Sequence, residues 1–244
     1  MSSDALALYG GTFDPIHLGH TRVAQAAREA CGFATLHLLP AADPPLRIAP
    51  GASAVHRLAM ARLACEDLPG FVVDDRELRR AGPSFTVDTL AEVRSEIGPV
   101  RPLVWLLGRD AIARIDRWHR YEELLDHAHF LVLDRSGAMV EEGAARPSDA
   151  ATAWVARHRR GDLRGLHASP AGGLFFLDGP RIPISATAVR RACAAGADAA
   201  GLLAPKVWSY ICRHGLYGTD GKGVAAATPG ASPSTCMPPT GPRA

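Results

Sequence analysis

The sequence predicts an α/β protein with a doubly wound, mostly parallel sheet of the Rossmann-like type. Short apolar runs alternate along the chain with amphipathic stretches of helical period. This alternation implies parallel strands that are joined by right-handed crossover helices. A glycine-rich turn also separates the first apolar run from the first amphipathic stretch. In such sheets, ligands bind beyond the carboxyl ends of the strands, where the strand order reverses.

The expected strands are short apolar runs bounded by turn residues, and the expected helices lie between and after them. The strands are Leu6–Tyr9, Thr35–Leu39, Phe71–Val73, Leu103–Leu107, Phe130–Leu133 and Leu174–Leu177. The helices are Leu18–Cys31, Val55–Glu66, Val87–Ile97, Tyr121–Asp126, Ala151–Arg159 and one from Ser185 to about Ala195.

The chain is expected to form a single domain over residues 1–218. Residues 136–170 are less periodic and are interpreted as an excursion within that domain. Residues 219–244 consist mainly of small and polar side chains and proline. Such a segment cannot bury enough apolar surface to offset its ordering entropy, so it is expected to be a disordered tail.

Composition excludes several function classes. The formal net charge of +2 gives no reason to expect a nucleic-acid or membrane partner. The five cysteines show no C-x-x-C spacing, which fits a reducing compartment and indicates neither a disulfide framework nor a metal site. The amino terminus lacks the pattern of a secretion signal. We therefore expect a cytoplasmic globular protein, either a monomer or a homo-oligomer.

The first loop, Gly10–His20, predicts a phosphate-binding corner. A glycine pair after the strand permits a tight turn in which backbone N–H groups approach a ligand closely. His17 and His20 fall on one face where the next helix opens, beside its positive dipole end. The loop has neither the lysine of a P-loop nor the third glycine of a dinucleotide-binding loop. A zinc pair and an ordinary helix start are the alternatives.

A second anion site is expected at Ile184–Thr187. Ser185 is placed to cap the helix that follows, and Thr187 then lies in its first turn. Exposed N–H groups and hydroxyls at such a helix start bind anions, and Arg190 lies one turn further on, from where it can reach back to a phosphate. The alternative is a capped surface helix with a solvated arginine.

The two segments together resemble the paired signature of the nucleotidylyltransferase superfamily of the T/H-x-G-H type. Further matches indicate its bacterial nicotinate-nucleotide adenylyltransferase family, and the resemblance covers about residues 5–217. These matches are Pro44–Arg47, Arg57–Met60, Glu77–Leu90, Gly108–Asp110, Trp118, His129–Arg135 and Val207–Tyr217. The block Ser84–Leu90 and Trp118 favour this family within the superfamily.

The resemblance implies a nucleotidyltransferase fold and transfer of the adenylyl group of ATP to nicotinate mononucleotide, giving deamido-NAD and pyrophosphate. It implies that His17, His20 and Arg47 act in catalysis, and that Mg²⁺ is carried by the ATP phosphates rather than by a protein metal site. The implied ATP-binding residues are Gly10, Gly11, Thr12, Phe13, His17, His20, Asp110, Ser185, Thr187 and Arg190.

The implied acceptor site would bind nicotinate mononucleotide through the start of one helix and an aromatic face. Its residues are Ser84, Phe85, Thr86, Trp118, His119 and Arg135. Trp118 suits stacking on a pyridine ring, whereas a core role is the alternative for it. For Asp110, Ser84 and Thr86 the alternative is helix capping.

Four positions depart from the family pattern: Leu46, Phe85, Arg109 and His119. Because both histidines of the first loop are present, we expect an active enzyme. The same chemistry on nicotinamide mononucleotide remains open, and so does a nucleotide-binding regulator without turnover. A pantetheine-phosphate acceptor is disfavoured, because that family is expected to be shorter and to lack the Ser84–Leu90 block.

Overall fold

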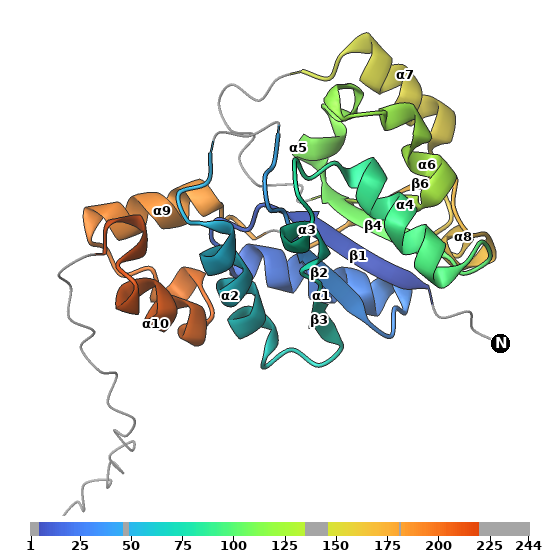
Figure 1. Ribbon diagram of the computed structural model, residues 1–244. Helices are drawn as coiled ribbons and strands as arrows, with labels where there is room; N and C mark the ends of the chain where they lie inside the picture. Colours follow the sequence, from blue (N-terminus) through green and yellow to red (C-terminus); the bar gives the residue numbers. More distant parts are fainter. Residues whose placement is uncertain (1–4, 46–48, 135–145, 181, 220–244) are drawn as a thin grey trace, which may run out of the picture.

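The computed structural model describes residues 5–45, 49–134, 146–180 and 182–219 (Figure 1). Its centre is a six-stranded parallel sheet in the order β3-β2-β1-β4-β5-β6. The strands are β1 (Leu6–Gly11), β2 (Leu36–Pro40), β3 (Phe71–Val73), β4 (Leu103–Gly108), β5 (His129–Asp134) and β6 (Leu174–Asp178). All six predicted strands and the predicted fold class are confirmed.

Ten α-helices and four 3₁₀ turns connect or follow these strands in the described part of the chain. The helices are α1 (Leu18–Cys31), α2 (Ala54–Cys65), α3 (Arg76–Arg79), α4 (Thr86–Ile97), α5 (Arg109–Ile112), α6 (Leu124–His127), α7 (Asp149–His158), α8 (Gly165–Ala168), α9 (Ala186–Ala195) and α10 (Pro205–Arg213). The 3₁₀ turns are η1 (Ile115–Arg117), η2 (Tyr121–Glu123), η3 (Ala200–Leu202) and η4 (Leu216–Gly218).

Most predicted helices are present within one or two residues of their expected ends. The expected helix Tyr121–Asp126 is instead the turn η2 followed by α6. Helix α10 was not expected from the sequence, although its apolar positions Val207 and Ile211 are buried at helical spacing. Proline stands at the start of α10, where its missing N–H costs nothing.

The strand order reverses between β1 and β4. From β1 the chain builds outward to β2 and β3, and it then returns to pair β4 with the other side of β1. The connections that leave two neighbouring strands in opposite directions open a crevice at their carboxyl ends. Gly11 ends β1 and Gly108 ends β4, so the predicted first loop and the segment that carries Asp110 both begin at this crevice.

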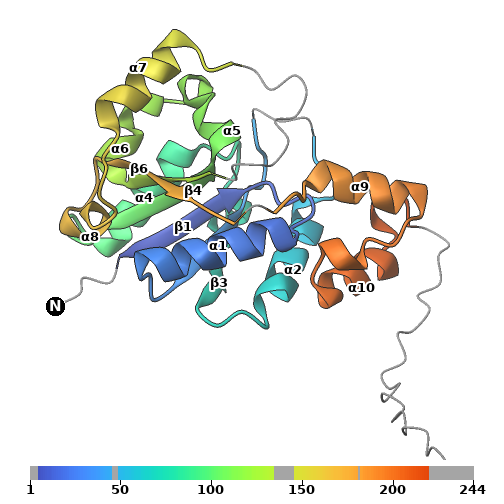
Figure 2. The same ribbon diagram turned by 180° about the vertical axis from the view of Figure 1, so that it is seen from behind.

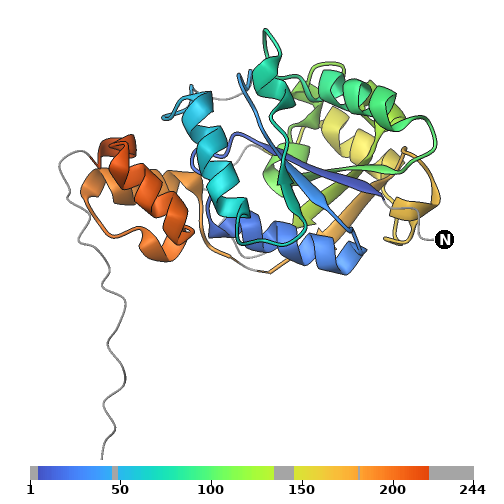
Figure 3. The ribbon, with the colours of Figure 1, turned by 60° about the horizontal axis from the view of Figure 1, so that its bottom comes forward.

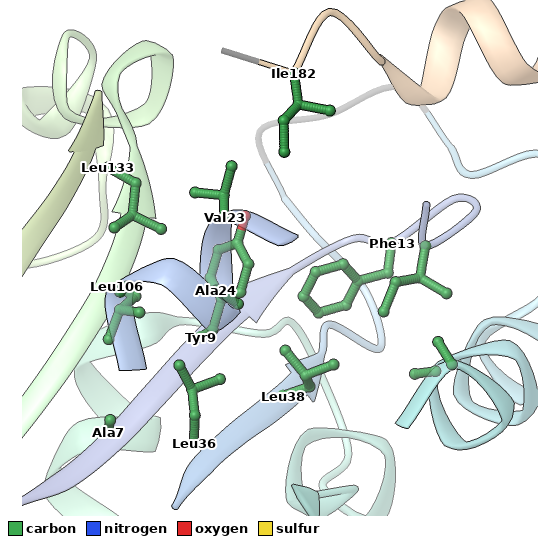
Figure 4. Close-up of a cluster of buried hydrophobic side chains, with 14 of the residues drawn as sticks. Ala7, Tyr9, Phe13, Val23, Ala24, Leu36, Leu38, Leu106, Leu133 and Ile182 are labelled. Atoms are coloured by element: carbon green, nitrogen blue, oxygen red, sulfur yellow. The ribbon is translucent and has the colours of Figure 1, made fainter. Parts of the chain in front are cut away.

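Alternate residues of each strand feed two hydrophobic cores, one on each face of the sheet. Ala7 and Tyr9 of β1 belong to the core beneath α1, α2, α9 and α10 (Figure 4). Leu6 and Leu8 belong to the opposite core, beneath α4, α6 and α7. Helix α1 crosses the first face (Figure 2), and α9 and α10 lie beside α2 at one end of the molecule (Figure 3).

Arg94 of α4 connects the loops that precede three strands. Its guanidinium donates hydrogen bonds to the carbonyl oxygens of His127 at 2.7 Å, Pro170 at 2.8 Å and Gly98 at 3.0 Å, and also to that of Arg101. These carbonyls lie just before β4, β5 and β6. One side chain therefore fixes the amino-terminal edge of half the sheet.

Thr219, the first residue of the predicted tail, is buried. Its hydroxyl donates to the carbonyl oxygens of Leu216 at 3.0 Å and Ile211 at 3.2 Å. The remainder of the predicted tail, residues 220–244, lies outside the described residues.

Replacing Arg94 by Met should lower the free energy of unfolding by about 2–4 kcal/mol, because several half-buried loop carbonyls lose a charged donor. Thermal unfolding should show a melting temperature about 5–15 °C lower. Arg22→Met is the matched control, because Arg22 is exposed on α1 and should change stability by no more than about 0.5 kcal/mol. Equal effects of the two substitutions would contradict the role of Arg94.

Candidate active site

The glycine pair lies within β1 and not in a turn after it. Gly10 and Gly11 are the last two residues of the strand and pair with Leu39 and Pro40 of β2. A Cβ at Gly10 would lie 2.1 Å from the Trp105 indole, and one at Gly11 would lie 2.9 Å from the Phe13 ring. The expected tight glycine turn is therefore wrong. These positions are glycine because aromatic side chains pack against their backbone.

Phe13 connects the first loop to the core. Its backbone has a φ of 48°, and its ring points into the core beneath α1 (Figure 4). There it meets Tyr9 edge-on, with ring centroids 5.6 Å apart. The same ring contacts His20 edge-on, with centroids 5.1 Å apart. The imidazole of His20 is thereby packed against the rigid interior.

His17 and His20 lie together at the start of α1, as the sequence predicted. His17 is the N-cap residue and His20 is the third residue of the helix. Their rings stack with centroids 3.7 Å apart and planes inclined by 25°. Because imidazole lone pairs lie in the ring plane, stacked rings do not direct them toward one ion. This geometry argues against the zinc alternative.

A backbone hydrogen bond selects the tautomer of His20. The His17 N–H donates to Nδ1 of His20 at 3.3 Å. Nδ1 is therefore the acceptor, and the ring proton resides on Nε2 in the neutral form. His20 is half-buried, whereas His17 is only 2% exposed. The arrangement gives His20 an N–H donor on the side of the ring away from the helix backbone.

Gly19 brings the two halves of the candidate site together. A Cβ at Gly19 would lie 2.9 Å from the His17 ring and 3.2 Å from the carbonyl oxygen of Ile184. The start of α1 and the segment before α9 therefore touch at this glycine. Ser185 caps α9 as predicted, because its Oγ accepts from the Ala188 N–H at 3.2 Å.

Arg190 reaches back across the site from α9. Its Nη1 donates to the backbone oxygen of Asp14 at 2.7 Å, and its Nη2 donates to Thr187 Oγ1 at 3.4 Å. The side chain is 36% exposed, so part of the guanidinium also faces solvent. The structure thus places Ser185, Thr187 and Arg190 beside the first loop.

Asp14 and Arg57 were not expected to hold this site together. The Asp14 carboxylate is 93% buried and accepts hydrogen bonds from Gly51 N–H at 2.7 Å, Ala52 N–H at 3.1 Å and Tyr217 Oη at 2.7 Å. Arg57, which is 1% exposed, donates to the carbonyl oxygens of Thr12, Ala41, Ala42 and Ala52. Burial lowers the pKa of Arg57, and the negative charge of Asp14 opposes that shift.

The block before α4 is bonded largely to itself and to the loop after β2. Ser84 Oγ accepts from the N–H groups of Ala42 at 3.0 Å and Asp43 at 3.3 Å. Glu77 is 6% exposed, and its carboxylate accepts from Thr89 Oγ1 at 2.9 Å. Burial raises the pKa of Glu77, although hydrogen bonds from Ser84 and Thr89 oppose the shift. The Ser84 hydroxyl therefore makes its hydrogen bonds within the protein, where it holds the loop after β2.

The start of α4 carries no side-chain cap. Phe85 is the N-cap residue and Thr86 the first helical residue, and no side chain bonds the first turn. The capping alternative for Ser84 and Thr86 is therefore wrong. The Phe85 ring stacks on His119 with centroids 4.3 Å apart and planes inclined by 28°.

The residues after β4 lie at the same edge of the sheet. Asp110 lies in the first turn of α5, and its side chain is 65% exposed. The N-cap of α5 is Gly108, so the capping alternative for Asp110 is also wrong. Trp118 is half-buried and packs against the core beneath α4, whereas His119 is exposed.

Two of the predicted site residues, Arg47 and Arg135, lie outside the described residues. Within the described residues there is no group of three or more histidine, cysteine or acidic side chains that could hold a metal ion. The same part of the chain contains no helix with the length and apolarity needed to cross a membrane. A hollow of about 640 Å³ that His129, Arg160 and Phe175 help to line lies at the amino-terminal edge of β5 and β6, away from the site.

Comparisons with known proteins show the family to which the chain is similar. A cytidylyltransferase-like family model matches residues 8–192. A "probable nicotinate-nucleotide adenylyltransferase" of Stenotrophomonas maltophilia is 46% identical over 214 residues, which is 86% of this chain and 95% of the relative. One of Aeromonas hydrophila is 44% identical over 217 residues, which is 89% of this chain and 99% of the relative.

A solved structure shares the fold at low sequence identity. The Plasmodium falciparum nicotinic acid mononucleotide adenylyltransferase complexed with NaAD superposes with a TM-score of 0.65 and 17% identity. The match covers 88% of this chain and 97% of that one. The same protein complexed with APC gives a TM-score of 0.62.

Glu77→Gln tests whether the pKa of the buried Glu77 carboxylate is raised in the folded protein. Because the folded-state pKa of Glu77 is raised, the folded protein binds more protons than the unfolded chain just above the ordinary glutamate pKa. The stability that the protonated form of Glu77 contributes is lost as the pH rises through the folded-state pKa of this residue. Urea unfolding from pH 4 to 8 should show the variant gaining stability relative to the parent protein as the pH rises. A constant difference across that range would contradict the raised pKa.

Proposed function

Because the chain belongs to the cytidylyltransferase-like family and, within it, to the nicotinate-nucleotide adenylyltransferases, we propose that it transfers the adenylyl group of ATP to nicotinate mononucleotide. The products are deamido-NAD and pyrophosphate, so the enzyme serves NAD biosynthesis. We place it in the cytoplasm, where ATP is available. The observation that carries the proposal is the contact of the two predicted phosphate-binding segments at Gly19 and Ile184.

The reaction is an in-line displacement at phosphorus. An oxygen of the nicotinate mononucleotide phosphate attacks the α-phosphorus of ATP, and the bond from that phosphorus to the bridging oxygen of the β-phosphate breaks. Pyrophosphate leaves with the bonding electrons. No covalent intermediate with the protein is needed, so catalysis consists of positioning and of stabilising the charge that develops on phosphate oxygens.

His20 is the best placed group for charge stabilisation. Its Nε2–H is fixed as a donor by the bond that Nδ1 receives from the His17 backbone, and the start of α1 adds a positive dipole end. His17 lies against it and lines the same corner. Preorganised donors of this kind stabilise a transition state because they need no reorientation during the reaction.

Ser185, Thr187 and Arg190 are proposed to hold the β- and γ-phosphates, which leave as pyrophosphate. They lie at the start of α9, where N–H groups and the helix dipole favour anions. Mg²⁺ is proposed to be carried by the ATP phosphates, consistent with its preference for phosphate oxygens and water. Arg47 is proposed to act near the same phosphates.

The acceptor is proposed to bind between the start of α4 and the segment after β4. The uncapped N–H groups around Thr86 are suited to the nicotinate carboxylate. Trp118 is proposed to stack on the pyridine ring, beside the ring pair Phe85 and His119. Asp110 is proposed to accept hydrogen bonds from ribose hydroxyls.

A pyrophosphate-release assay with ATP tests the proposed reaction. Purified protein is given nicotinate mononucleotide or nicotinamide mononucleotide in parallel, and the dinucleotide product is identified by mass spectrometry. Release that requires nicotinate mononucleotide and yields deamido-NAD is the expected result. Faster turnover of the amide substrate would move the assignment to that acceptor, and ATP binding without turnover of either would favour a regulator.

His20→Ala should lower kcat about 10²–10³-fold, because the transition state loses a preorganised donor. The KM for nicotinate mononucleotide should change by less than about threefold, since His20 lies on the ATP side. His20→Asn is the matched variant: its amide oxygen can still accept from the His17 N–H, but the side chain is too short to replace Nε2. It should lose kcat similarly and keep the melting temperature. A kcat close to that of the parent protein in either variant would refute the role.

A further inference from the structure

The last described turn of the chain reaches the phosphate corner. Tyr217, in η4, donates a hydrogen bond from Oη to Oδ1 of Asp14 at 2.7 Å, across 203 positions of sequence. Burial and the bond to Asp14 both raise the pKa of Tyr217. The phenol therefore stays protonated at neutral pH and always acts as the donor to this carboxylate.

The backbone of Tyr217 is held in a conformation that its side chain disfavours. Its φ of 58° and ψ of 28° lie in the left-handed region, which non-glycine residues rarely adopt. Such conformations persist where the surrounding structure over-determines them, and they concentrate at functional sites. The neighbouring residues Gly215 and Gly218 have positive φ values without this cost.

Tyr217 and Arg190 approach the same carboxylate from either side of Gly51. A Cβ at Gly51 would lie 3.3 Å from the Tyr217 ring and 3.6 Å from Cδ of Arg190. Arg190 Nη1 forms an ion pair with Oδ2 of Asp14 at 3.7 Å, and it donates its hydrogen bond to the backbone oxygen of Asp14 at 2.7 Å. Oδ2 accepts its hydrogen bond from the Gly51 N–H. The carboxylate and the guanidinium are thus paired by charge, without a hydrogen bond between them.

We propose that the hydroxyl of Tyr217 is a positioning group for the nucleotide: it keeps the Asp14 carboxylate from forming a hydrogen-bonded ion pair with Arg190, so that the guanidinium stays available to the triphosphate. Asp14 is one negative charge between the guanidiniums of Arg57 and Arg190, so the local balance stays positive where phosphates are proposed to bind. Without the hydroxyl, Oδ1 keeps only the Ala52 N–H. The carboxylate would then turn toward Arg190 and form a hydrogen bond with it, so that the guanidinium would offer less positive charge to the triphosphate. The proposal rests on the function proposed for this site.

Tyr217→Phe removes the hydroxyl and keeps the ring. Binding of adenosine 5′-(α,β-methylene)triphosphate, measured by calorimetry, should weaken about tenfold. This factor corresponds to the loss of one hydrogen bond between Arg190 and a phosphate of the analogue. In the turnover assay the KM for ATP should rise by a similar factor, while the KM for nicotinate mononucleotide stays within about twofold. The matched control is Tyr210→Phe, because Tyr210 lies on α10 and bonds His56 at 2.9 Å, outside this network. It should change neither constant.

A double-mutant cycle separates positioning from general stability. In an Arg190→Ala background, Tyr217→Phe should weaken analogue binding by less than about twofold further, because the group on which it acts is gone. An equal loss in both backgrounds, or unchanged binding in Tyr217→Phe itself, would overturn the proposal.

Two further outcomes are decided by the same measurements. If Tyr217→Phe unfolds at the assay temperature, Gly51→Ala tests the same link. The added methyl would lie 3.3 Å from the Tyr217 ring, so the ring must shift by a few tenths of an ångström, and analogue binding should again weaken. Unchanged binding in that variant would count against the proposal.

If the parent protein binds the analogue but turns over neither mononucleotide, the proposed function fails, while the calorimetric comparison still decides the role of Tyr217. A parent protein that does not bind the analogue overturns both.

Discussion

The site depends on one buried carboxylate between two guanidiniums. Asp14 receives N–H groups from the segment before α2, the hydroxyl of Tyr217 and the positive field of Arg57 and Arg190. Burying a carboxylate is costly unless it is both paired and hydrogen-bonded. Because the carboxylate and the groups around it come from four separate parts of the chain, the network can form only when the first loop, α2, α9 and η4 are all in place. The corner where we propose that phosphate binds is therefore a property of the completed fold.

Two arginines, the buried Arg57 and the half-buried Arg94, fix opposite edges of the sheet in the same way. Arg57 bonds carbonyl oxygens of the loops after β1 and β2, at the carboxyl edge, and Arg94 bonds those before β4, β5 and β6. Loop carbonyls that turn away from the sheet have no strand partner, and a guanidinium can satisfy several at once with its five donors. Arg57 thus positions the edge where we propose that the reaction occurs, and Arg94 positions an edge where we propose no chemistry.

The block from Glu77 to Thr89 shows why a family resemblance does not assign roles to single side chains. Ser84 was proposed to contact the acceptor, yet its hydroxyl bonds the loop after β2. Glu77 and Thr89 bond each other in the interior. The side chains of this block mainly hold the loop after β2 against α4, and they leave the first N–H groups of α4 without a side-chain cap. The resemblance thus predicts an acceptor region here, and the uncapped start of α4 favours backbone groups rather than the Ser84 hydroxyl as its donors.

The sequence alone determined the six strands, the main helices, the doubly wound sheet and the place of the first loop at the carboxyl end of a strand. These follow from local signals, because apolar periodicity, glycines and a serine cap act within a few residues of each other. Tertiary structure decided the rest. That Gly10 makes room for Trp105, that Gly19 touches Ile184, and that Tyr217 reaches Asp14 depend on contacts between distant segments. No local pattern encodes such contacts, because packing and the pairing of buried charge are settled only when both partners are brought together.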